Sequence, residues 1–311
     1  MRILITGGAG FIGSHLTDRL VEDGHEVTVI DNLSHGKKHQ VPPQARFYEA
    51  DVTGPELDGI FEACRPEVVY HHAAQINVVT SLQQPLKDAG TNILGTLALL
   101  MHCKKYGVKK IVYASSAAVY GTPQYLPVDE RHPVKPLSFY GISKHSPEHY
   151  IEAFSALYGI DYTIFRYANV YGPRQDPEGE GGVISIFLNK LAKGEVPAIF
   201  GDGYQTRDFI YVKDIVSANA AALTSGGGRT LNVSCNVPSS VNGLLELLCS
   251  LTGNKVTAEY KPALPGDIRH SVLCNEAAKS ELIWTPQYSL EEGLKDTLAF
   301  EKMADQTNDE K

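Results

Sequence analysis

The chain has 311 residues, 43% of them apolar and 21% charged, so it is long enough for about two domains and apolar enough for a core of normal size. Its net charge of −8, with no long basic cluster, argues against nucleic acid and against an anionic membrane surface as the main partner. No stretch reaches membrane-spanning length, and the first expected strand begins directly behind Met1 without room for a signal peptide, so we expect a cytoplasmic protein.

Short β-rich runs alternate with helical runs through the first half of the chain. Helical periodicity covers residues 11–21 and about 91–105, and a further helix is expected to begin near Tyr140, after Pro136. Strands are expected at residues 2–6, 26–30, 47–48, 67–71, 110–114 and 161–165. Alternation at this spacing predicts an α/β fold, a doubly wound parallel sheet with helices on both faces.

The pattern loosens after about Asn169, where stretches rich in glycine, proline and aspartate appear. Helices are expected at about 183–193 and 241–252, between isolated strands. We therefore expect a first domain over residues 1–170, with return segments near 206–235. A smaller α/β domain that binds the substrate is expected over residues 171–311.

The segment from Thr6 to Gly13 has the spacing G-x-x-G-x-x-G and lies between the first expected strand and the first expected helix. Glycine allows a tight turn and a close approach of the backbone to a pyrophosphate, which then rests on the helix N-terminus. Asp31 follows 18 residues after Gly13, at the end of the second strand. Its carboxylate suits a ribose 2′-hydroxyl and repels a 2′-phosphate, so this Rossmann-type site predicts NAD, although Lys37 and Lys38 keep NADP open.

Tyr140 and Lys144 are four residues apart, which places both side chains on one face of the expected helix. A phenol has a pKa of about 10 and is a poor base at neutral pH. A neighbouring ammonium favours the phenolate, and a bound nicotinamide cation would add to that effect. The pair therefore has the chemistry needed to take a proton from a sugar hydroxyl, although this spacing alone also occurs by chance on many helices.

Two residue types that often bind metals give no metal site in this sequence. His71 and His72 are adjacent on an expected strand, so their side chains point to opposite faces and do not chelate one ion together. The five cysteines are scattered without a C-x-x-C pair, as expected for buried thiols in a reducing compartment. We expect neither a metal nor a disulfide framework.

Taken together, these segments resemble the extended short-chain dehydrogenase/reductases, and among them the UDP-sugar 4-epimerases. The resemblance runs from residue 2 to about 290. Its landmarks are residues 7–13 (GGAGFIG), 71–74 (HHAA), 115–121 (SSAAVYG), Tyr140 with Lys144, 166–173 (RYANVYGP), 201–203 (GDG) with 207–212 (RDFIYV), and 265–269 (PGDIR). The resemblance implies an isomerase that carries NAD and acts on a UDP-sugar.

The resemblance also implies roles for matching positions. Ser116 matches the serine that hydrogen-bonds the reacting hydroxyl, Tyr140 the base, and Lys144 its activator. Cofactor contacts are expected from Gly7, Gly10, Phe11, Ile12, Gly13, Asp31, Asn32, Asp51, Val52, Ala73, Ala74, Asn92, Tyr140, Lys144 and Tyr167. Substrate contacts are expected from Ser116, Tyr140, Asn169, Arg207, Arg269 and Ser271. The two arginines suit phosphate oxygens, unless they pair with Asp208 or Asp267 instead.

The implied reaction begins when Tyr140 takes the proton of the sugar 4-hydroxyl while hydride passes from C4 to NAD⁺, giving a 4-keto sugar. Related 4,6-dehydratases carry an Asp-Glu pair, and UDP-glucuronate decarboxylases a glutamate, in the stretch where this chain has Ala117 and Ala118. Alanine does no acid–base work. The implied outcome is return of the hydride to the other face of the keto sugar, which is 4-epimerisation.

The sequence leaves the sugar open. Ser271 stands where some epimerases restricted to glucose and galactose place a tyrosine, and a small residue there makes room for a 2-acetamido group. The alternative interpretation, given equal weight, is that Ser271 is only a polar loop residue and that the pocket is closed elsewhere. UDP-glucuronate 4-epimerase, a net nucleotide-sugar oxidoreductase and a non-catalytic dinucleotide sensor are the alternatives. The helices around 92–105 and 140–158 resemble those that pair in a four-helix interface, so a homodimer is expected.

Overall fold

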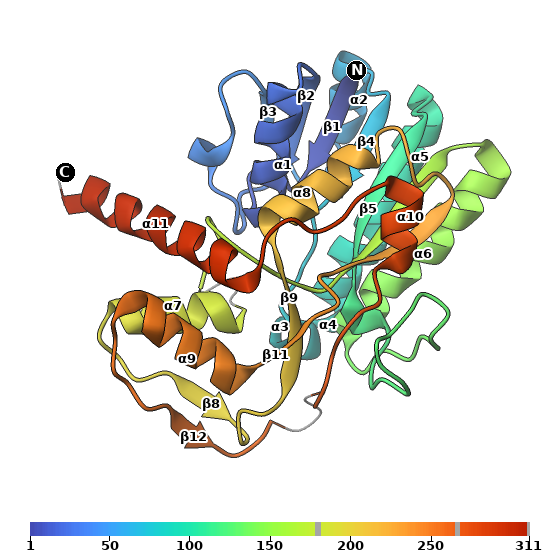
Figure 1. The fold of residues 1–311 in the computed structure, drawn as a ribbon. Coiled ribbons are helices and arrows are strands. Elements are labelled where there is room, and N and C mark those ends of the chain that lie inside the picture. Colours follow the sequence, from blue (N-terminus) through green and yellow to red (C-terminus); the bar gives the residue numbers. More distant parts are fainter. Residues whose placement is uncertain (178–181, 265–267, 310–311) are drawn as a thin grey trace.

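The computed structural model describes residues 1–177, 182–264 and 268–309. Within these ranges the chain forms a seven-stranded parallel sheet of order β10-β6-β5-β4-β1-β2-β3 (Figure 1). The strands are β1 (Arg2–Thr6), β2 (Glu26–Asp31), β3 (Arg46–Glu49), β4 (Val68–His71), β5 (Lys110–Ser116), β6 (Asp161–Tyr167) and β10 (Arg229–Val233). The strand order reverses between β1 and β4, so their carboxyl ends flank the switch point at which open α/β sheets bind ligands.

Helices cover both faces of this sheet. α1 (Phe11–Glu22) and α8 (Val212–Ala221) pack together on one face, and α2 (Leu57–Cys64), α5 (Gly95–Tyr106) and α6 (Phe139–Tyr158) cover the other. Alternate residues of β1 divide between the two cores, with Ile3 and Ile5 in the first and Leu4 in the second. The expected doubly wound α/β fold is confirmed.

A second group of elements follows β6 in the described part of the chain. β7 (Asn169–Tyr171), β9 (Thr206–Tyr211) and β11 (Pro238–Ser240) form a three-stranded sheet, and β8 (Ala198–Phe200) pairs with β12 (Glu259–Lys261). α7 (Val183–Ala192), α9 (Val241–Thr252) and α11 (Leu290–Asp309) contribute to the apolar core beside these strands (Figure 1). β9 leads into α8, and β10 pairs with β6, so the chain returns to the main sheet. The domain boundary at residue 170 stays a prediction.

Short elements surround the carboxyl ends of β4 and β5. α3 (Val78–Gln83) and α4 (Pro85–Ala89) lead into a π-turn (Gly90–Leu94) ahead of α5, and a 3-10 turn (Ala117–Val119) follows β5. A second 3-10 turn (Lys38–Gln40) follows β2, and α10 (Glu276–Leu282) packs against β10. The helix expected at 91–105 therefore begins as a π-turn, a wider turn that is frequent at functional sites.

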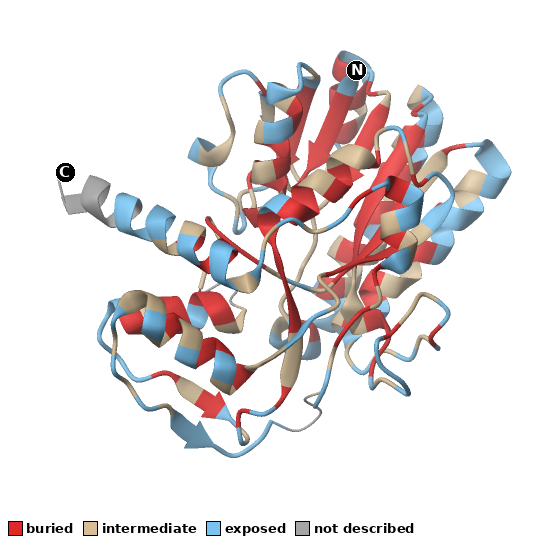
Figure 2. Cartoon of the chain, viewed as in Figure 1, coloured by how far each residue is buried: buried red, intermediate tan, exposed pale blue. Residues whose placement is uncertain are grey.

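Burial follows the layers (Figure 2). The central strands of the main sheet and the inward faces of its helices are buried, whereas the edge strand β3 and the outward faces of the helices are partly or fully exposed. Buried tyrosines find partners for their hydroxyls; Tyr171 donates to the carbonyl of Leu290, and Tyr211 to the carboxylate of Asp296. Both bonds tie α11 to the three-stranded sheet. In the described part of the chain, no helix is both long and apolar enough to cross a membrane.

Candidate active site

Three adjoining hollows open at the carboxyl ends of the main strands. The first, which we call the β2 hollow, is lined by Gly7, Asp31 and Asp51 among others. The central hollow runs from the glycine turn to Tyr140, Lys144 and Tyr167. The outer hollow, of about 430 Å³, shares Ser116, Tyr140 and Asn169 with the central one. Most of the residues predicted for the cofactor and for the substrate thus line these three adjoining hollows.

The glycine turn leaves no space for side chains where it meets the hollows. Gly7 has a φ of +71°, and a Cβ there would lie 2.6 Å from the backbone nitrogen of Ala73. A Cβ at Gly13 would overlap the carbonyl oxygen of Gly7. Gly10 is the N-cap of α1 and has no side chain to occupy the first backbone N–H groups of that helix. The turn therefore offers an uncapped, positive helix end to an anionic group.

Asp31 is fixed at the end of β2. Its Oδ2 accepts from the backbone N–H of Ala9 at 3.0 Å and its Oδ1 from that of Leu33 at 2.8 Å. Burial raises the pKa of this carboxyl, against the effect of the two hydrogen bonds. Lys38 lies over the ring of Phe47, 5.4 Å from its centroid. The other predicted cofactor residues that line the β2 hollow are Asn32, Asp51, Val52, Ala73 and Ala74.

The N-terminal turns of α6 place Tyr140 and Lys144 at the central hollow. The hydroxyl of Ser138 caps the helix by accepting from the N–H of Gly141. Lys144 is buried, and its Nζ donates to the carbonyl of Ala114 on β5 at 2.8 Å. Burial lowers the pKa of Lys144 to about 8. Across the hollow, Ser116 ends β5 and accepts from the N–H of Ala118 at 3.2 Å.

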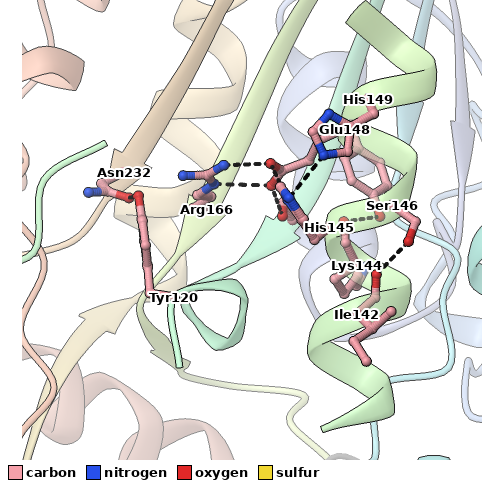
Figure 3. A network of polar contacts seen from close by, with 11 residues as sticks. Tyr120, Ile142, Lys144, His145, Ser146, Glu148, His149, Arg166 and Asn232 are labelled. Atoms are coloured by element: carbon pink, nitrogen blue, oxygen red, sulfur yellow. Dashed lines mark hydrogen bonds and ion pairs between the residues drawn. The ribbon is translucent and has the colours of Figure 1, made fainter. Parts of the chain in front are cut away.

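One turn further along α6, Glu148 joins the helix to the sheet (Figure 3). Its carboxylate accepts from the Ser115 hydroxyl at 2.5 Å and from His145 Nδ1 at 3.1 Å. The Arg166 guanidinium binds both carboxylate oxygens, at 3.1 and 2.6 Å. Burial alone would raise the pKa of Glu148, but the hydrogen bonds from His145, Arg166 and Ser115 outweigh it and lower the pKa to about 2.

The same network reaches the wall of the outer hollow. Arg166 lies over the ring of Tyr120, 4.8 Å from the centroid, and the Tyr120 hydroxyl donates to Asn232 Oδ1 on β10 at 2.7 Å (Figure 3). Tyr120 itself lines the outer hollow. Buried, paired side chains behind the cavity therefore fix β5 and α6, the elements that carry the catalytic candidates. We call this network of Glu148, Arg166 and their partners the brace. Sequence reasoning missed this brace, although Glu148 continues the spacing of four set by Tyr140 and Lys144.

Asn92, predicted to order cofactor and water, projects from the π-turn and is buried. Its Oδ1 accepts from the backbone N–H of Gln75 at 2.7 Å, and its Nδ2 donates to the Ser143 hydroxyl at 2.8 Å. Asn92 therefore connects the loop after β4 to α6. Its predicted contact with the cofactor stays a prediction.

The predicted substrate residues divide between two places. Asn169, Arg207 and Ser271 line the outer hollow with Ser116 and Tyr140. The backbone of Ser271 is held there because its N–H donates to the carbonyl of Thr206 at 3.1 Å. Small side chains, from Ala117 and Ala118, form part of the same wall. Catalytic and substrate candidates that are far apart in the sequence thus face one cavity.

Arg269 lies instead in a fourth hollow, which adjoins the outer hollow and is lined by residues 122–126 and 268–270. It is about half exposed and forms a two-pronged ion pair with Asp202, at 2.6 and 2.9 Å. The alternatives weighed from the sequence were Asp208 and Asp267. Asp208 accepts from the backbone N–H groups of Cys235, Asn236 and Leu273, and Asp267, with Pro265 and Gly266, lies outside the described residues.

His71 and His72 have different surroundings, as adjacent residues at a strand end should. His71 is buried between the hydroxyls of Thr6 and Thr96, at 2.7 and 2.9 Å from its two ring nitrogens. His72 faces the hollows and stacks on Tyr167. Among the residues with described side chains, no group of three or more histidine, cysteine, aspartate or glutamate residues is placed to hold a metal ion.

A family model decides the relationship. Residues 3–234 match the NAD dependent epimerase/dehydratase family. The chain belongs to this family. The match spans the glycine turn, Ser116, Tyr140, Lys144 and Arg207, so the resemblance recognised in the sequence is confirmed.

Relatives agree over nearly the whole length. A UDP-glucose 4-epimerase of Mycolicibacterium smegmatis is 41% identical over 307 residues, which cover 96% of this chain and 98% of that protein. The structure of a Thermotoga maritima UDP-glucose 4-epimerase with UDP-glucose superposes with a TM-score of 0.96 at 46% identity, covering 98% of this chain and 99% of the other. A UDP-N-acetylglucosamine 4-epimerase of Methanobrevibacter ruminantium, in complex with UDP-N-acetylmuramic acid, has a TM-score of 0.93 at 35% identity, with coverage of 97% and 98%.

Proposed function

We propose that this protein is an isomerase that catalyses NAD-dependent 4-epimerisation of a UDP-hexose. The observation that carries the proposal is that Ser116, Tyr140 and Asn169 line both the central and the outer hollow, which adjoin. Lys144 lines the central hollow and Arg207 the outer one. The reactive groups and the groups suited to a nucleotide diphosphate therefore face the same space. The substrates proposed are UDP-glucose and UDP-galactose, with the N-acetylated pair as a second set.

The cofactor residues fit NAD. The glycine turn excludes side chains and presents the N-terminus of α1 to a diphosphate, while Asp31 presents a carboxylate suited to ribose hydroxyls. Of the two lysines that kept NADP open, Lys37 and Lys38, the second lies over the ring of Phe47. NAD⁺ held by these residues would supply a hydride acceptor for C4 of the sugar that is regenerated within one turnover.

The chain's own residues handle the proton. Tyr140 takes the proton of the sugar 4-hydroxyl and returns it after the sugar has turned. Lys144 favours the phenolate form of Tyr140 through its positive charge, and Ser116 hydrogen-bonds the reacting oxygen. Lys144 is held in place by the carbonyl of Ala114, so its ammonium is oriented before substrate binds.

The residues that follow Ser116 restrict which reaction the 4-keto sugar can undergo. Ala117 and Ala118, which line the cavity, offer no acid or base for dehydration or decarboxylation. The 4-keto sugar formed by the first half-reaction can then only be reduced again, from one face or the other. Reduction from the opposite face gives the epimer and regenerates the cofactor.

The outer hollow favours a neutral hexose over a uronic acid. Arg207 is the one cationic side chain among the described residues that line it, and we assign Arg207 with Asn169 to the diphosphate. The undescribed residues 178–181 and 265–267 include no lysine, arginine or histidine. A sugar carboxylate would therefore lack a cationic partner in a partly desolvated site. Arg269 joins the diphosphate site if it turns away from Asp202.

An NMR time course tests the function. The purified protein, without added cofactor, is incubated in parallel with UDP-glucose, UDP-N-acetylglucosamine and UDP-glucuronate. We expect galacto isomers from the first two and none from the third. No conversion of any of them, with and without added NAD⁺, would refute the proposal, and stoichiometric NADH release would establish a net oxidoreductase instead.

Tyr140→Phe is the matched variant for this assay, because it removes only the hydroxyl. We expect turnover to fall by at least roughly 100-fold while NAD binding is retained. Undiminished turnover would refute the assignment of the base, and retained biological activity of an inactive variant would favour the dinucleotide sensor.

We also propose that the protein is a cytoplasmic homodimer. Apolar side chains are exposed along the two helices expected to pair, namely Leu94 in the π-turn before α5, Met101 on α5, and Ile142, Tyr150 and Leu157 on α6. Exposed apolar rows of this kind favour burial against a second copy. The cytoplasmic location is supported by the acidic composition and the scattered cysteines.

A further inference from the structure

His72 lies at the junction of the β2 hollow and the central hollow. The two hollows share Gly7, Gly10, His72 and Ile76. Of these four residues, only His72 has a side chain that forms hydrogen bonds. A dinucleotide that fills both hollows has its diphosphate at their junction, because the diphosphate joins its two nucleosides.

One ring nitrogen of His72 is left without a partner among the described residues. This atom, Nδ1, is out of contact with solvent. The other nitrogen, Nε2, lies 3.4 Å from the hydroxyl of Tyr167, and the two rings stack with their centroids 6.3 Å apart. Leaving a buried polar atom unpaired is costly, so the arrangement indicates a group that the chain itself does not supply.

The surroundings of Tyr167 place the ring hydrogen of His72. Asn219 Nδ2 donates to the Tyr167 hydroxyl oxygen at 2.7 Å, and two acceptors lie near the hydroxyl hydrogen, Asn219 Oδ1 at 3.1 Å and His72 Nε2 at 3.4 Å. The N–H of the Asn219 amide points at this hydroxyl oxygen, so a second bond from the same hydroxyl back to the adjacent amide oxygen is poorly aligned. We assign that hydrogen to His72 Nε2, so the single hydrogen of the neutral ring is on Nδ1. The ring is neutral because burial, followed by the nearby charge of Lys144, lowers its pKa to about 3. Nδ1–H is then a donor, and a diphosphate offers acceptors.

The backbone of His72 also lies against the glycine turn. A Cβ at Gly7 would lie 2.8 Å from the carbonyl carbon of His72, so the two backbones are in contact. We propose that His72 is a cofactor ligand whose Nδ1–H donates a hydrogen bond to the diphosphate of the bound dinucleotide. This proposal rests on the proposed function, which places NAD in these hollows. His72 would add a side-chain donor to the backbone N–H groups at the start of α1.

Two amide substitutions separate the ring nitrogens. The side-chain amide of asparagine takes the place of Nδ1, and that of glutamine takes the place of Nε2. Wild type, His72→Asn, His72→Gln and His72→Phe are stripped of cofactor and titrated calorimetrically with NAD, with ADP-ribose and with UDP. ADP-ribose keeps the diphosphate but lacks the nicotinamide, and UDP reports that the substrate side is folded.

We expect His72→Phe and His72→Gln to lose roughly 10- to 100-fold in affinity for both NAD and ADP-ribose, because a hydrogen bond to a charged group is lost. His72→Asn should bind both within about threefold of wild type. UDP affinity should be equal in all four proteins.

Three results would overturn the assignment. The first is an NAD affinity that is unchanged in every variant. The second is an equal loss of affinity in the asparagine and glutamine variants. The third is a loss of NAD affinity with intact ADP-ribose affinity, which would place the contact on the nicotinamide. If His72→Phe does not fold, the contrast between asparagine and glutamine still decides. Wild type that binds UDP but not NAD would refute the proposed cofactor site itself.

Discussion

Asp31 shows how backbone hydrogen bonds fix the position of a single carboxylate at the end of a strand. Two backbone N–H groups, from Ala9 in the glycine turn and from Leu33 just beyond β2, hold its two oxygens apart and in place. A Cβ at Gly36 would lie 2.8 Å from Oδ1, so the following loop also packs closely against it. The residue therefore links the glycine turn to the loop after β2, which are the segments proposed for the diphosphate and the ribose.

Replacing Asp31 tests this link. We expect Asp31→Ala to lower the affinity for NAD by roughly 10- to 100-fold and to reduce the discrimination against NADP. The reason is that the hydrogen-bond acceptor and its negative charge are both removed. Calorimetric titration with NAD and NADP measures the ratio. Asp31→Asn, which keeps one acceptor oxygen, serves as the control and should retain more of the NAD affinity. An unchanged cofactor ratio in Asp31→Ala would contradict the ribose assignment.

Glu148 makes the stability of the fold depend on pH in the acidic range. Its folded pKa, about 2, is below its ordinary value of 4.5, so its stabilisation is complete above pH 4.5 and is lost as the pH falls toward 2. The shift corresponds to about 3 kcal/mol of the free energy of unfolding. We expect Glu148→Gln to be less stable than wild type at pH 7 and to approach it as the pH falls. Urea unfolding at pH 7 and pH 3 measures this, and a constant difference would argue against the prediction.

At the level of elements, α6 carries groups with opposite effects on stability. Lys144 and Glu148 are one turn apart on the same face and both are buried. Glu148 is paired with Arg166. Burial disfavours the charged form of Lys144, whose Nζ donates to the backbone carbonyl of Ala114. The helix therefore holds a costly ammonium where the proposed chemistry needs one, and the paired residues behind it keep the helix seated on β5 and β6.

Lys144→Met should separate stability from activity. The folded pKa of Lys144, about 8, is below its ordinary 10.5, so wild type gains stability as the pH rises from 8 to 10.5. We expect the methionine variant to be about 1–2 kcal/mol more stable than wild type at pH 7, with the gain shrinking by pH 10.5, and to lose turnover. Denaturant unfolding at both pH values measures the gain. Lys105→Met, on the surface, is the control, and a destabilised Lys144→Met would contradict the argument.

The elements differ in how far the sequence could reveal them. Buried strands such as β1 and β5 form continuous apolar runs, and the glycine turn and the spacing of Tyr140 and Lys144 are local features, so these were predicted. β10 lies within the return segment expected near 206–235 but was not predicted as a strand, because its pairing with β6 depends on a distant segment. The pairing of Arg269 with Asp202 escaped for the same reason: the two residues meet only after β8, β9 and the segment near residue 270 come together.

At the level of the whole molecule, the expected dimer can be tested through the exposed rows on α5 and α6. Leu157 is 72% exposed near the end of α6. We expect Leu157→Glu to raise the dimer dissociation constant by roughly 30-fold or more, since a charge would be buried in an apolar interface. Light scattering behind a sizing column, over a dilution series, measures it. Ile283 is 92% exposed and follows α10, which packs on the opposite face of the sheet from α5 and α6. Ile283→Glu should therefore leave assembly unchanged, and a monomeric wild type would refute the dimer.

The late return of the chain to the main sheet has a consequence for synthesis on the ribosome. β6 ends at Tyr167, but the strand that covers its edge begins only at Arg229. At a translation rate of roughly 5–20 residues per second, the nascent sheet presents an open edge for several seconds, and open edges pair readily with other chains. Truncated products that end before β10 are therefore expected to be captured by chaperones or to aggregate, and the nucleotide-binding half of this chain is a poor choice for expression alone.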